Sequence, residues 1–463
     1  MVGDFMTMMR TLPGIISRSG AAPPATPDFH ALTPDTGNNY LMKGVLTGTG
    51  TLTTTHTSVL YAPDFNGVYQ KFPANAPVWS GGRCVLTGAA GTNVVTVHGN
   101  DAPAGTPLAE MPYLQYYPAA TNSCLASQNI VNSTYWDVND TVRAYDQVGL
   151  TGAPNTATIL TDNSAVAFLN VGQAVYGMSG TFRTAVFYIK KTTGTLPWPS
   201  FQLWNGADSG SRIVVDFDTN TGAGDKRTAI GLDATDWEAV DLGDWWKVML
   251  YIQKTNLNSR SDIYIYPAVA NGTTTDVAFQ RSITIGNVEL HAGKTIAEVR
   301  GLGPIFTTTA AVSTDATVYS LNTANMANDN SLYWEGNTSG YGSEQQYLST
   351  GTGGGTYIHG HRFSGASQFA YVGGTINPGV TLPINTPVKV ASVGFTGTSD
   401  GVCNVGGVYS TAVTNYAGWQ TGTTFNIGAV SGRANYSFKM RNLQRYDIAS
   451  YTAGKTIIDG LMA

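Results

Sequence analysis

The sequence predicts an all-β chain in which two consecutive β-sandwiches make up most of the length. Short runs of alternating apolar and polar residues recur about every ten residues, and turns rich in Gly, Asn and Asp separate them. Long helical periodicity almost disappears after Pro27. With 42% hydrophobic residues, the 463-residue chain carries enough apolar material to bury a core.

The first 30 residues differ in composition from the rest. Met1–Met9 holds four of the eleven methionines, and Gly20–Pro27 has the composition of an extended proline-rich linker. We expect residues 1–30 to be an arm that docks onto another protein, with a frayed chain end as the alternative. A small β-region is expected to follow at residues 31–115.

The start of the chain does not match a secretory signal. Asp4 lies where a signal carries positive charge, and Arg10 interrupts the apolar run before it reaches the necessary length. We therefore expect the protein to be made in a cytosol.

The first sandwich is predicted at residues 116–310. Trp246–Lys254 places Trp, Val, Leu and Ile on one face and Lys, Met, Tyr and Gln on the other, which is typical of a half-buried strand. Ile263–Tyr266 is apolar or aromatic on both faces, so we expect a central strand there. A short connector, Gly301–Thr309, is stiffened by Pro304.

The second sandwich is predicted at residues 311–463. Val388–Val390 and Phe438–Arg441 alternate in the same way as the strands of the first sandwich. The one helix that the sequence supports is a short C-terminal stretch at about Thr452–Leu461. No repeat of fixed period is present, which disfavours a propeller or a β-helix.

Charge and cysteine content exclude several classes of protein. A net charge of −5 with 12% charged residues argues against nucleic-acid binding, which needs a basic face. No run approaches the roughly 18 apolar residues of a membrane span, so membrane insertion is not expected. Cys84, Cys124 and Cys403 lie far apart without metal-binding spacing, so we expect neither a disulfide framework nor a zinc site, and no cofactor.

Several segments resemble a family of bacteriophage tail and virion proteins. The resemblance begins with Asp64–Val68, Pro73–Trp79 and Leu114–Asn122, which are similar to the N-terminal segment of that family. It continues through Ala153–Asp162, Gly180–Lys190, Leu242–Val248, Gly286–Gly293 and Gly303–Thr308, in the family's order and over about 250 residues. The chain departs from the family pattern at Val78-Trp79, where the family has Arg-Phe, and at Leu114–Tyr117, which lacks its glutamate.

This resemblance implies a jelly-roll sandwich related to carbohydrate-binding modules, of the kind found in phage fibres and spikes. It implies a module that displays or binds rather than one that catalyses, and it transfers no binding residue. More loosely, Phe425–Ala429 with Tyr436–Tyr446 resembles the end of a concanavalin A or laminin-G type sandwich.

A cluster of acidic residues beside tryptophans is the first candidate site. The carboxylates are Asp233, Asp236, Glu238, Asp241 and Asp244, and the neighbouring rings are Trp237, Trp245 and Trp246. Paired carboxylates near aromatics are what a glycosidase needs. The alternative is a solvated acidic loop before a core strand, with Trp237 and Trp245 as carbohydrate-stacking rings, and we favour this interpretation.

Three further patterns point to possible chemistry. His359 and His361 lie on one face of a strand at a spacing that could bind a metal, but a site needs three or four ligands. Asp216–Gly222 begins like a calcium loop, yet Arg227 stands where the loop needs a carboxylate. Gly397–Gly401, with Ser399, fits a nucleophile elbow, but its flanks predict a hairpin instead of a strand-to-helix turn.

The sequence therefore predicts a structural protein of a phage virion: a tail fibre, spike or head-surface appendage that attaches to the host surface through carbohydrate. It predicts no enzymatic activity, localisation in the virion after synthesis in the host cytoplasm, a homotrimer, and other virion proteins as partners of the arm. A capsid decoration protein without receptor binding is the first alternative, and a polysaccharide depolymerase is the second.

Overall fold

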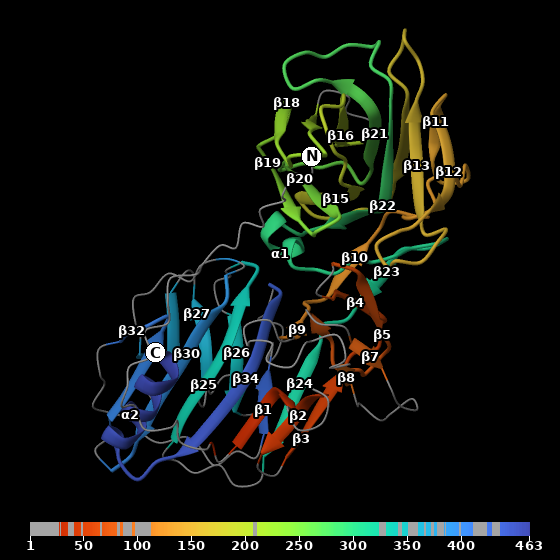
Figure 1. Cartoon of the computed structure of the whole chain (residues 1–463). Helices are drawn as coiled ribbons and strands as arrows, with labels where there is room; N and C mark the ends of the chain where they lie inside the picture. The colour runs from red at the N-terminus through yellow and green to blue at the C-terminus, as the bar shows by residue number, and fades with distance from the viewer. Residues whose placement is uncertain are drawn as a thin grey trace, which may run out of the picture.

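The computed structural model describes residue 27 and residues 29–35, 41–47, 50–64, 67–80, 84–86, 95–97, 113–206, 211–323, 330–340, 345–350, 360–364, 367–371, 375–376, 384, 386–397, 400–410, 424–427 and 436–463. The predicted docking arm, residues 1–30, lies almost entirely outside these residues. Figure 1 shows two β-lobes, the first yellow to green and the second cyan to blue, with the red N-terminal strands alongside the second.

The all-β prediction is confirmed. In the described part of the chain every element is a strand except two helices, α1 (Ile296–Arg300) and α2 (Tyr451–Met462). Helix α2 lies where the sequence predicted it, whereas α1 was not predicted. A capping box between Thr295 and Glu298 begins α1, because each side chain accepts from the other's backbone N–H. No helix among the described residues is long and apolar enough to cross a membrane.

The first lobe is a sandwich of two six-stranded antiparallel sheets. The front sheet has the order β11-β14-β21-β16-β17-β18: β11 (Asp137–Asn139), β14 (Asn170–Val175), β21 (Ser261–Ala270), β16 (Trp198–Trp204), β17 (Arg212–Phe217) and β18 (Gly224–Ile230). The back sheet has the order β12-β13-β22-β15-β20-β19: β12 (Val142–Gln147), β13 (Ala157–Asp162), β22 (Arg281–Ala292), β15 (Phe182–Lys190), β20 (Trp245–Gln253) and β19 (Ala234–Asp241).

Alternating side chains from both sheets fill the core of the first sandwich. Phe187, Phe201 and Phe217 form a chain of aromatic contacts, with centroid distances of 4.6 Å and 6.3 Å, between the two sheets. Strand β21 is third of the six strands in its sheet, so the central position predicted for Ile263–Tyr266 is confirmed. Ile263 and Ile265 point into this core.

The second lobe is also a sandwich, and N-terminal strands complete it. One sheet has the order β2-β1-β34-β25-β30-β31-β32, with β9 against β34 and β6 against β9: β1 (Phe29–Asp35), β2 (Leu41–Thr47), β6 (Trp79–Ser80), β9 (Tyr113–Tyr116), β25 (Asn330–Thr338), β30 (Val388–Phe395), β31 (Asp400–Val405), β32 (Val408–Tyr409) and β34 (Phe438–Asp447). The other has the order β29-β28-β27-β26-β33-β24-β3: β3 (Gly50–Thr55), β24 (Val318–Thr323), β26 (Gln345–Thr350), β27 (Gly360–Ser364), β28 (Ser367–Tyr371), β29 (Thr375–Ile376) and β33 (Thr424–Ile427).

Strand pairing therefore joins the two ends of the chain. Strand β1 pairs with β34, as the red and blue strands of Figure 1 show, and β3 pairs with β24. The region predicted at residues 31–115 thus contributes much of its β-structure to the sandwich predicted at residues 311–463, and the boundaries between them stay a prediction. Three two-stranded ladders complete the fold: β4 (Leu60–Pro63) with β5 (Tyr69–Phe72), β7 (Cys84–Leu86) with β8 (Val95–Val97), and β10 (Ala120–Asn122) with β23 (Val312–Thr314).

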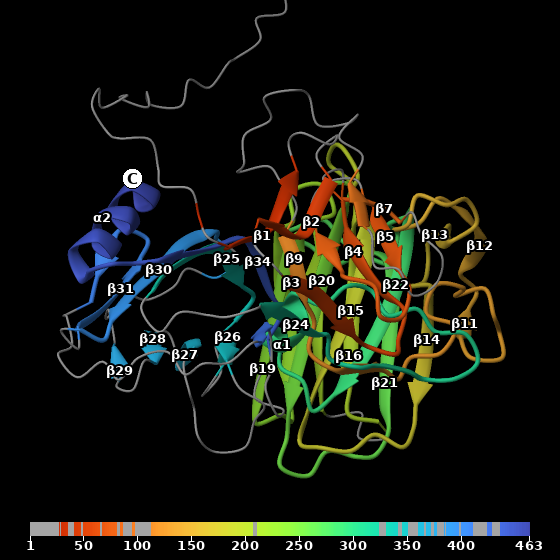
Figure 2. The ribbon, with the colours of Figure 1, turned by 90° about the horizontal axis from the view of Figure 1, so that it is seen from below.

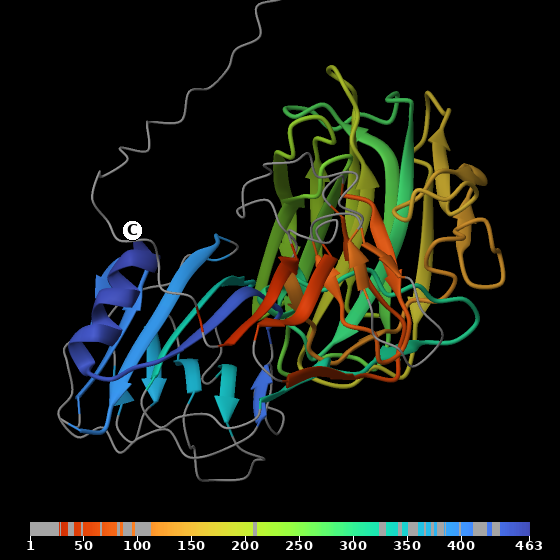
Figure 3. The same ribbon diagram turned by 60° about the horizontal axis from the view of Figure 1, so that its bottom comes forward.

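Helix α2 covers one face of the second sandwich. Figures 2 and 3 show it lying along β30 at the outer side of this lobe. Gly454 allows the close approach, because a Cβ there would lie 2.7 Å from both Ser331 Oγ and Val393 Cγ1.

The half-buried character predicted for Trp246–Lys254 is wrong for the first half of the strand and right for the second, where Tyr251 and Gln253 stay partly exposed. Trp246, Val248 and Leu250 face the core as expected, but Lys247 and Met249 on the other face are also buried. The cause is that the connector, α1 and the N-terminal region pack against the outside of the back sheet. The sequence of a strand with one polar face therefore suggests that this face is exposed to solvent, although in the structure another part of the chain covers it.

Polar groups hold this junction together. The Lys247 ammonium group, in a residue that is 1% exposed, donates to the carbonyls of Val299 at 2.6 Å, Arg300 at 3.2 Å and Leu302 at 2.9 Å. Glu289, which is fully buried, accepts from the Ile305 backbone N–H at 2.8 Å. Burial lowers the pKa of Lys247 to about 8.

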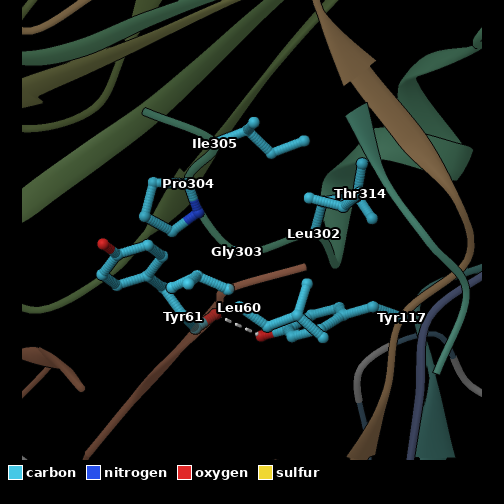
Figure 4. Close-up of a pocket in the computed structure, with 9 residues that line it drawn as sticks. Leu60, Tyr61, Tyr117, Leu302, Gly303, Pro304, Ile305 and Thr314 are labelled. Atoms are coloured by element: carbon cyan, nitrogen blue, oxygen red, sulfur yellow. Dashed lines mark hydrogen bonds between the residues drawn. The ribbon is translucent and has the colours of Figure 1, made fainter. Parts of the chain in front are cut away.

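A small pocket lies where the connector meets the N-terminal region. Pro304 and Ile305 line one side and Tyr61 and Tyr117 the other, and the Tyr117 hydroxyl donates to the Tyr61 carbonyl at 2.9 Å (Figure 4). A Cβ at Gly303 would come within 1.9 Å of the Tyr61 carbonyl oxygen. The pocket is therefore a packing feature of the junction, closed by tight backbone contact.

Candidate functional site

The outer face of the front sheet carries a group of aromatic side chains. Because Ile263 and Ile265 of β21 point into the core, Tyr264 and Tyr266 point outward, and both rings stay partly exposed. On the neighbouring β16, Phe201 and Leu203 point inward, so Trp204 points outward. The main packing contacts of these strands with other described elements go to their sheet neighbours and to the back sheet. On the outer face the three aromatic rings stay partly exposed, whereas polar residues such as Ser200 and Asp216 are buried.

Strand register arranges these side chains in rows. Tyr266 lies opposite Ser200, which lies opposite Asp216 on β17. The next row contains Tyr264 and Gln202, and the third contains Trp204 and Arg212. We call this set, with Arg227 of β18, the aromatic face; its members are Ser200, Gln202, Trp204, Arg212, Asp216, Arg227, Tyr264 and Tyr266.

Close contacts fix the rings of the aromatic face. The Trp204 and Tyr264 rings meet edge to face with centroids 5.3 Å apart. Tyr264 lies against Gly172 of β14, where a Cβ would come within 2.7 Å of the ring. Trp204 Nε1 donates to Gln202 Oε1 at 2.9 Å, and the Arg212 guanidinium lies 4.7 Å from the Trp204 ring centroid. The rings are therefore held in place before any ligand arrives.

Polar groups lie beside the rings. Arg227 Nε donates to Asp216 Oδ2 at 2.8 Å, and Arg227 Nη2 donates to Ser200 Oγ at 3.3 Å. Asp216 is 3% exposed, and its second oxygen, Oδ1, is buried without a hydrogen-bond partner among the described residues. Such an oxygen is uncommon in a folded protein.

The two tyrosine hydroxyls are free to bind. Neither the Tyr264 nor the Tyr266 hydroxyl forms a hydrogen bond within the described part of the chain. Burial raises the pKa of both phenols, and the positive charges of Arg212 and Arg227 oppose this at Tyr266. Both phenols therefore stay protonated near neutral pH and can donate as well as accept.

The arrangement suits recognition of a ligand with one apolar side and several hydroxyls. A sugar ring presents C–H groups that stack on aromatic rings, and its hydroxyls pair with the surrounding carboxylate, amide and guanidinium groups. The chemistry available on this face is therefore binding through stacking and hydrogen bonds.

The tryptophans predicted from the sequence do not belong to this face. Trp237 lies in β19 opposite Leu250, on the inward side, where its ring packs against Gly224 at the edge of the sandwich. The expectation that it lies on an exposed loop is wrong. Trp245 is 6% exposed and packs against Leu150 and Gly286, so its ring offers no surface for stacking.

The acidic residues around these tryptophans do not converge either. Three of them bind different partners: Asp233 accepts from Thr255, Glu238 pairs with Arg300, and Asp241 pairs with Lys191. These bonds hold the three carboxylates to different parts of the fold, whereas a glycosidase needs two that face one substrate.

The other candidate site residues from the sequence either have ordinary structural roles or lie outside the residues that the structure describes. His359 and Ser399 lie outside the described residues, as does the side chain of His361 in β27. Gly397 and Asp400 flank the turn of the β30–β31 hairpin, which confirms the hairpin prediction there. Among the described residues no three His, Cys, Asp or Glu side chains lie together so that they could hold a metal ion.

The calcium-like segment closes on itself. Asp218 Oδ1 accepts from the Asn220 backbone N–H at 2.9 Å, and Asp218 Oδ2 accepts from Thr221 Oγ1 at 2.6 Å. Asp216 is bound by Arg227, the residue that occupies the position where a calcium loop has its carboxylate. A guanidinium group therefore takes the place that a cation would need.

Sequence reasoning missed Trp204, Tyr264 and Tyr266. The signal was present: in Ile263–Tyr266 the two isoleucines and the two tyrosines occupy opposite faces of the strand, and Phe201–Trp204 alternates similarly. Ile263–Tyr266 was interpreted as a central strand that is apolar or aromatic on both faces, and no prediction was made for Trp204.

Comparison with known proteins finds solved structures that are similar to this chain but no protein family to which it can be assigned. No protein-family model matches the sequence, and no curated protein matches it. A solved structure of Trypanosoma rangeli sialidase is 10% identical with a TM-score of 0.24, and the match covers 64% of this chain and 61% of the sialidase. A proposed carbohydrate-binding protein from Bacteroides ovatus is 9% identical with a TM-score of 0.25, covering 73% of this chain and 84% of that one.

A tail fibre protein from a phage of E. coli is also similar, at 9% identity and a TM-score of 0.22, with 71% of this chain and 41% of the fibre covered. Laminin G domains of mouse laminin α1 are similar at 10% identity and a TM-score of 0.21, with 61% of this chain and 86% of that one covered, in keeping with the β-sandwich fold. At these TM-scores the matches carry no argument about activity.

One prediction is corrected by the comparison. The sequence was interpreted as that of a protein without enzymatic activity, yet the similar structures include sialidases, which are enzymes. The exclusion of catalysis therefore no longer stands. Phage-fibre and laminin-G structures are among the similar ones, in line with the families that the sequence resembles.

Proposed function

We propose that this chain is a structural protein of a phage virion and that its first sandwich binds a glycan of the host surface through the aromatic face. The observation that carries the proposal is the outward placement of Trp204, Tyr264 and Tyr266, whose rings stay partly exposed. The resemblance of the surrounding sequence to phage tail and virion proteins supports the location in the virion.

The expected binding free energy fits a weak glycan site that the virion presents in several copies. An aromatic contact contributes about 0.5–1.5 kcal/mol beyond its area burial, so three rings and a few hydrogen bonds give modest affinity for one chain. Several chains presented together raise the apparent affinity, because later contacts become intramolecular. A homotrimer attached through residues 1–30 to other virion proteins would present three such faces towards the host.

The test is a glycan array probed with the full-length chain. We expect the wild type to bind a subset of glycans and Trp204→Ala to bind them up to about tenfold more weakly. Tyr145→Ala is the matched control, since Tyr145 is a partly exposed aromatic residue on β12 of the back sheet. Equal loss in both variants, or no glycan binding by the wild type, would contradict the proposal; the second result would favour a decoration protein without receptor binding.

A further inference from the structure

A further exposed tyrosine lies on the same side of the front sheet as the aromatic face. Tyr176 directly follows β14 and is 68% exposed, so most of its ring is accessible. Val171 and Val175 of β14 point into the core, and the residues that alternate with them therefore point outward. Gly172 is one of these and lies opposite Tyr264, which places Tyr176 on the outer side as well.

A series of contacts connects Tyr176 to the aromatic face. The Arg260 guanidinium lies 5.3 Å from the Tyr176 ring centroid, and Arg260 Nε donates to Asp262 Oδ1 at 2.7 Å. Asp262 lies opposite Trp204 in the ladder between β21 and β16. Because Asp262 is only 4% exposed, its role is to hold Arg260, and Arg260 in turn holds the Tyr176 ring.

Strand geometry gives the length of this line of side chains. Tyr266, Tyr264 and Asp262 are alternate residues of β21, and Arg260 directly precedes the strand. From Tyr266 to Arg260 the backbone covers about 20 Å, at about 3.4 Å per residue. Rings interact when their centroids are about 4.5–7 Å apart, so one sugar ring cannot contact both ends of the line. A ligand that uses the whole line has to be a chain of several rings.

On the basis of the proposed glycan binding, we infer that the aromatic face and Tyr176 form one extended site for several consecutive units of a linear polysaccharide, which lies along β21. Neighbouring units stack on Tyr264 and Tyr266, next to Trp204. A unit further along the same polysaccharide chain stacks on Tyr176.

The form of the site favours an internal stretch of the polysaccharide over its terminal sugar. A site for one small ligand is concave and encloses most of the ligand surface. Here the rings are spread along the face of a sheet and stay partly exposed, and Tyr176 is mostly exposed. Each unit that stacks on a ring adds its own contribution, so affinity should rise with the length of the glycan by up to about tenfold for each ring engaged.

The experiment is isothermal titration of the full-length chain with fragments of one purified host-surface polysaccharide, obtained by partial acid hydrolysis and separated by length. For the wild type the dissociation constant should fall with increasing fragment length, by at least tenfold in all, and then become constant. Tyr176→Ala should bind the shortest fragments as the wild type does and should bind the long ones up to about tenfold more weakly.

Tyr409→Ala is the matched control. Tyr409 also lies beneath a cation, since Lys455 Nζ is 4.4 Å from its ring centroid, but it belongs to β32 of the second sandwich. This variant should bind every fragment length as the wild type does. Melting curves of all variants establish that the chains compared are folded.

The outcomes separate the extended site from the proposed function. Equal affinity of the wild type for all fragment lengths, with binding lost in Trp204→Ala, overturns the extended site and leaves glycan binding in place. A Tyr176→Ala variant that matches the wild type at every length, or that loses affinity equally at every length, also overturns the extended site only. If the wild type binds neither the fragments nor the intact polysaccharide, both are overturned.

Discussion

Replacing Lys247 with methionine removes the ammonium group that joins the back sheet to α1 and the connector, while the side chain keeps a similar length. The backbone carbonyls of Arg300 and Leu302 then lose their donor, while that of Val299 keeps a second one, the Leu302 backbone N–H at 3.1 Å. A buried acceptor without a partner costs about 1–3 kcal/mol. The variant therefore tests whether this junction stabilises the first sandwich.

The free-energy cost of burying the Lys247 charge, which opposes this loss, can be derived from the pKa of Lys247. Burial lowers the pKa of Lys247 from its ordinary 10.5 to about 8, which corresponds to about 3 kcal/mol for keeping the ammonium group buried. Methionine does not carry that cost. Two carbonyls that lose their donor cost about 2–6 kcal/mol, so the net expectation is that Lys247→Met is about 1 kcal/mol less stable than the wild type at about pH 7.

The sign of the pH dependence follows from the lowered pKa. Between pH 8 and 10.5 the unfolded chain binds the proton more strongly than the folded one, so the contribution of Lys247 to stability rises with pH across this window. Below pH 8 both states are protonated and the full cost of burial applies. The stability difference between wild type and Lys247→Met should therefore widen, by up to about 3 kcal/mol, as the pH rises to 10.5.

The assay is urea unfolding followed by tryptophan fluorescence at several pH values, with the full-length wild type and variant compared at each. Taking the difference removes the titration of groups present in both chains. Lys190→Met is the matched control, because Lys190 lies exposed at the end of neighbouring β15 and its loss should change stability by less than about 0.5 kcal/mol. A difference that stays constant with pH, or a variant as stable as the wild type, would refute the role given to Lys247.

Three further predictions concern the second sandwich and the assembly. Gly454→Leu should lower the melting temperature, since a Cβ there would lie 2.7 Å from Ser331 Oγ and Val393 Cγ1. Gly460→Ala in the same helix is the control: its Cβ meets nothing within 4 Å, so it should raise stability by about 0.5–1 kcal/mol. An unchanged melting temperature in Gly454→Leu would argue against the packing of α2. Deletion of residues 1–28, which spares β1 (Phe29–Asp35), should leave the folded chain intact and abolish incorporation into particles. A melting curve and an assembly assay would show this, and normal incorporation would contradict the docking role. Light scattering of the full-length protein should give a trimer, and a clean monomer would count against multivalent display.

Much of the fold could be predicted from local pattern. Alternation identified the strand at Ile263–Tyr266, and the hairpin around Gly397 and the C-terminal helix were placed correctly. These features depend on neighbours in the sequence, because strand alternation and turn chemistry act over a few residues.

The features that could not be predicted depend on distant contacts. The partners of Lys247 lie more than 50 residues away in α1 and the connector, so nothing in the strand itself showed that its polar face is covered. Likewise β1 reaches β34 at the opposite end of the chain. Pairing across such separations follows from the whole topology, which a single sequence does not disclose.

The prediction of the candidate site failed for a related reason. Trp237 has acidic neighbours and looked exposed, but its position opposite Leu250 turns the ring inward. Tyr264 and Tyr266 belong to a strand whose sequence is apolar or aromatic on both faces, but their rings stay partly exposed on the outer side of the sheet. Which face of a sandwich strand is open depends on which layers pack over it.

The most direct test of the account is the affinity of the aromatic face for a glycan. Isothermal titration of the full-length chain with a purified host-surface polysaccharide, compared with the Tyr264→Ala/Tyr266→Ala double variant, measures it. The account predicts a dissociation constant about 10–100-fold higher in the double variant, from the loss of two stacked rings, with a melting curve that shows the variant still folded at the assay temperature. An unchanged dissociation constant would contradict the claim that this face binds the glycan.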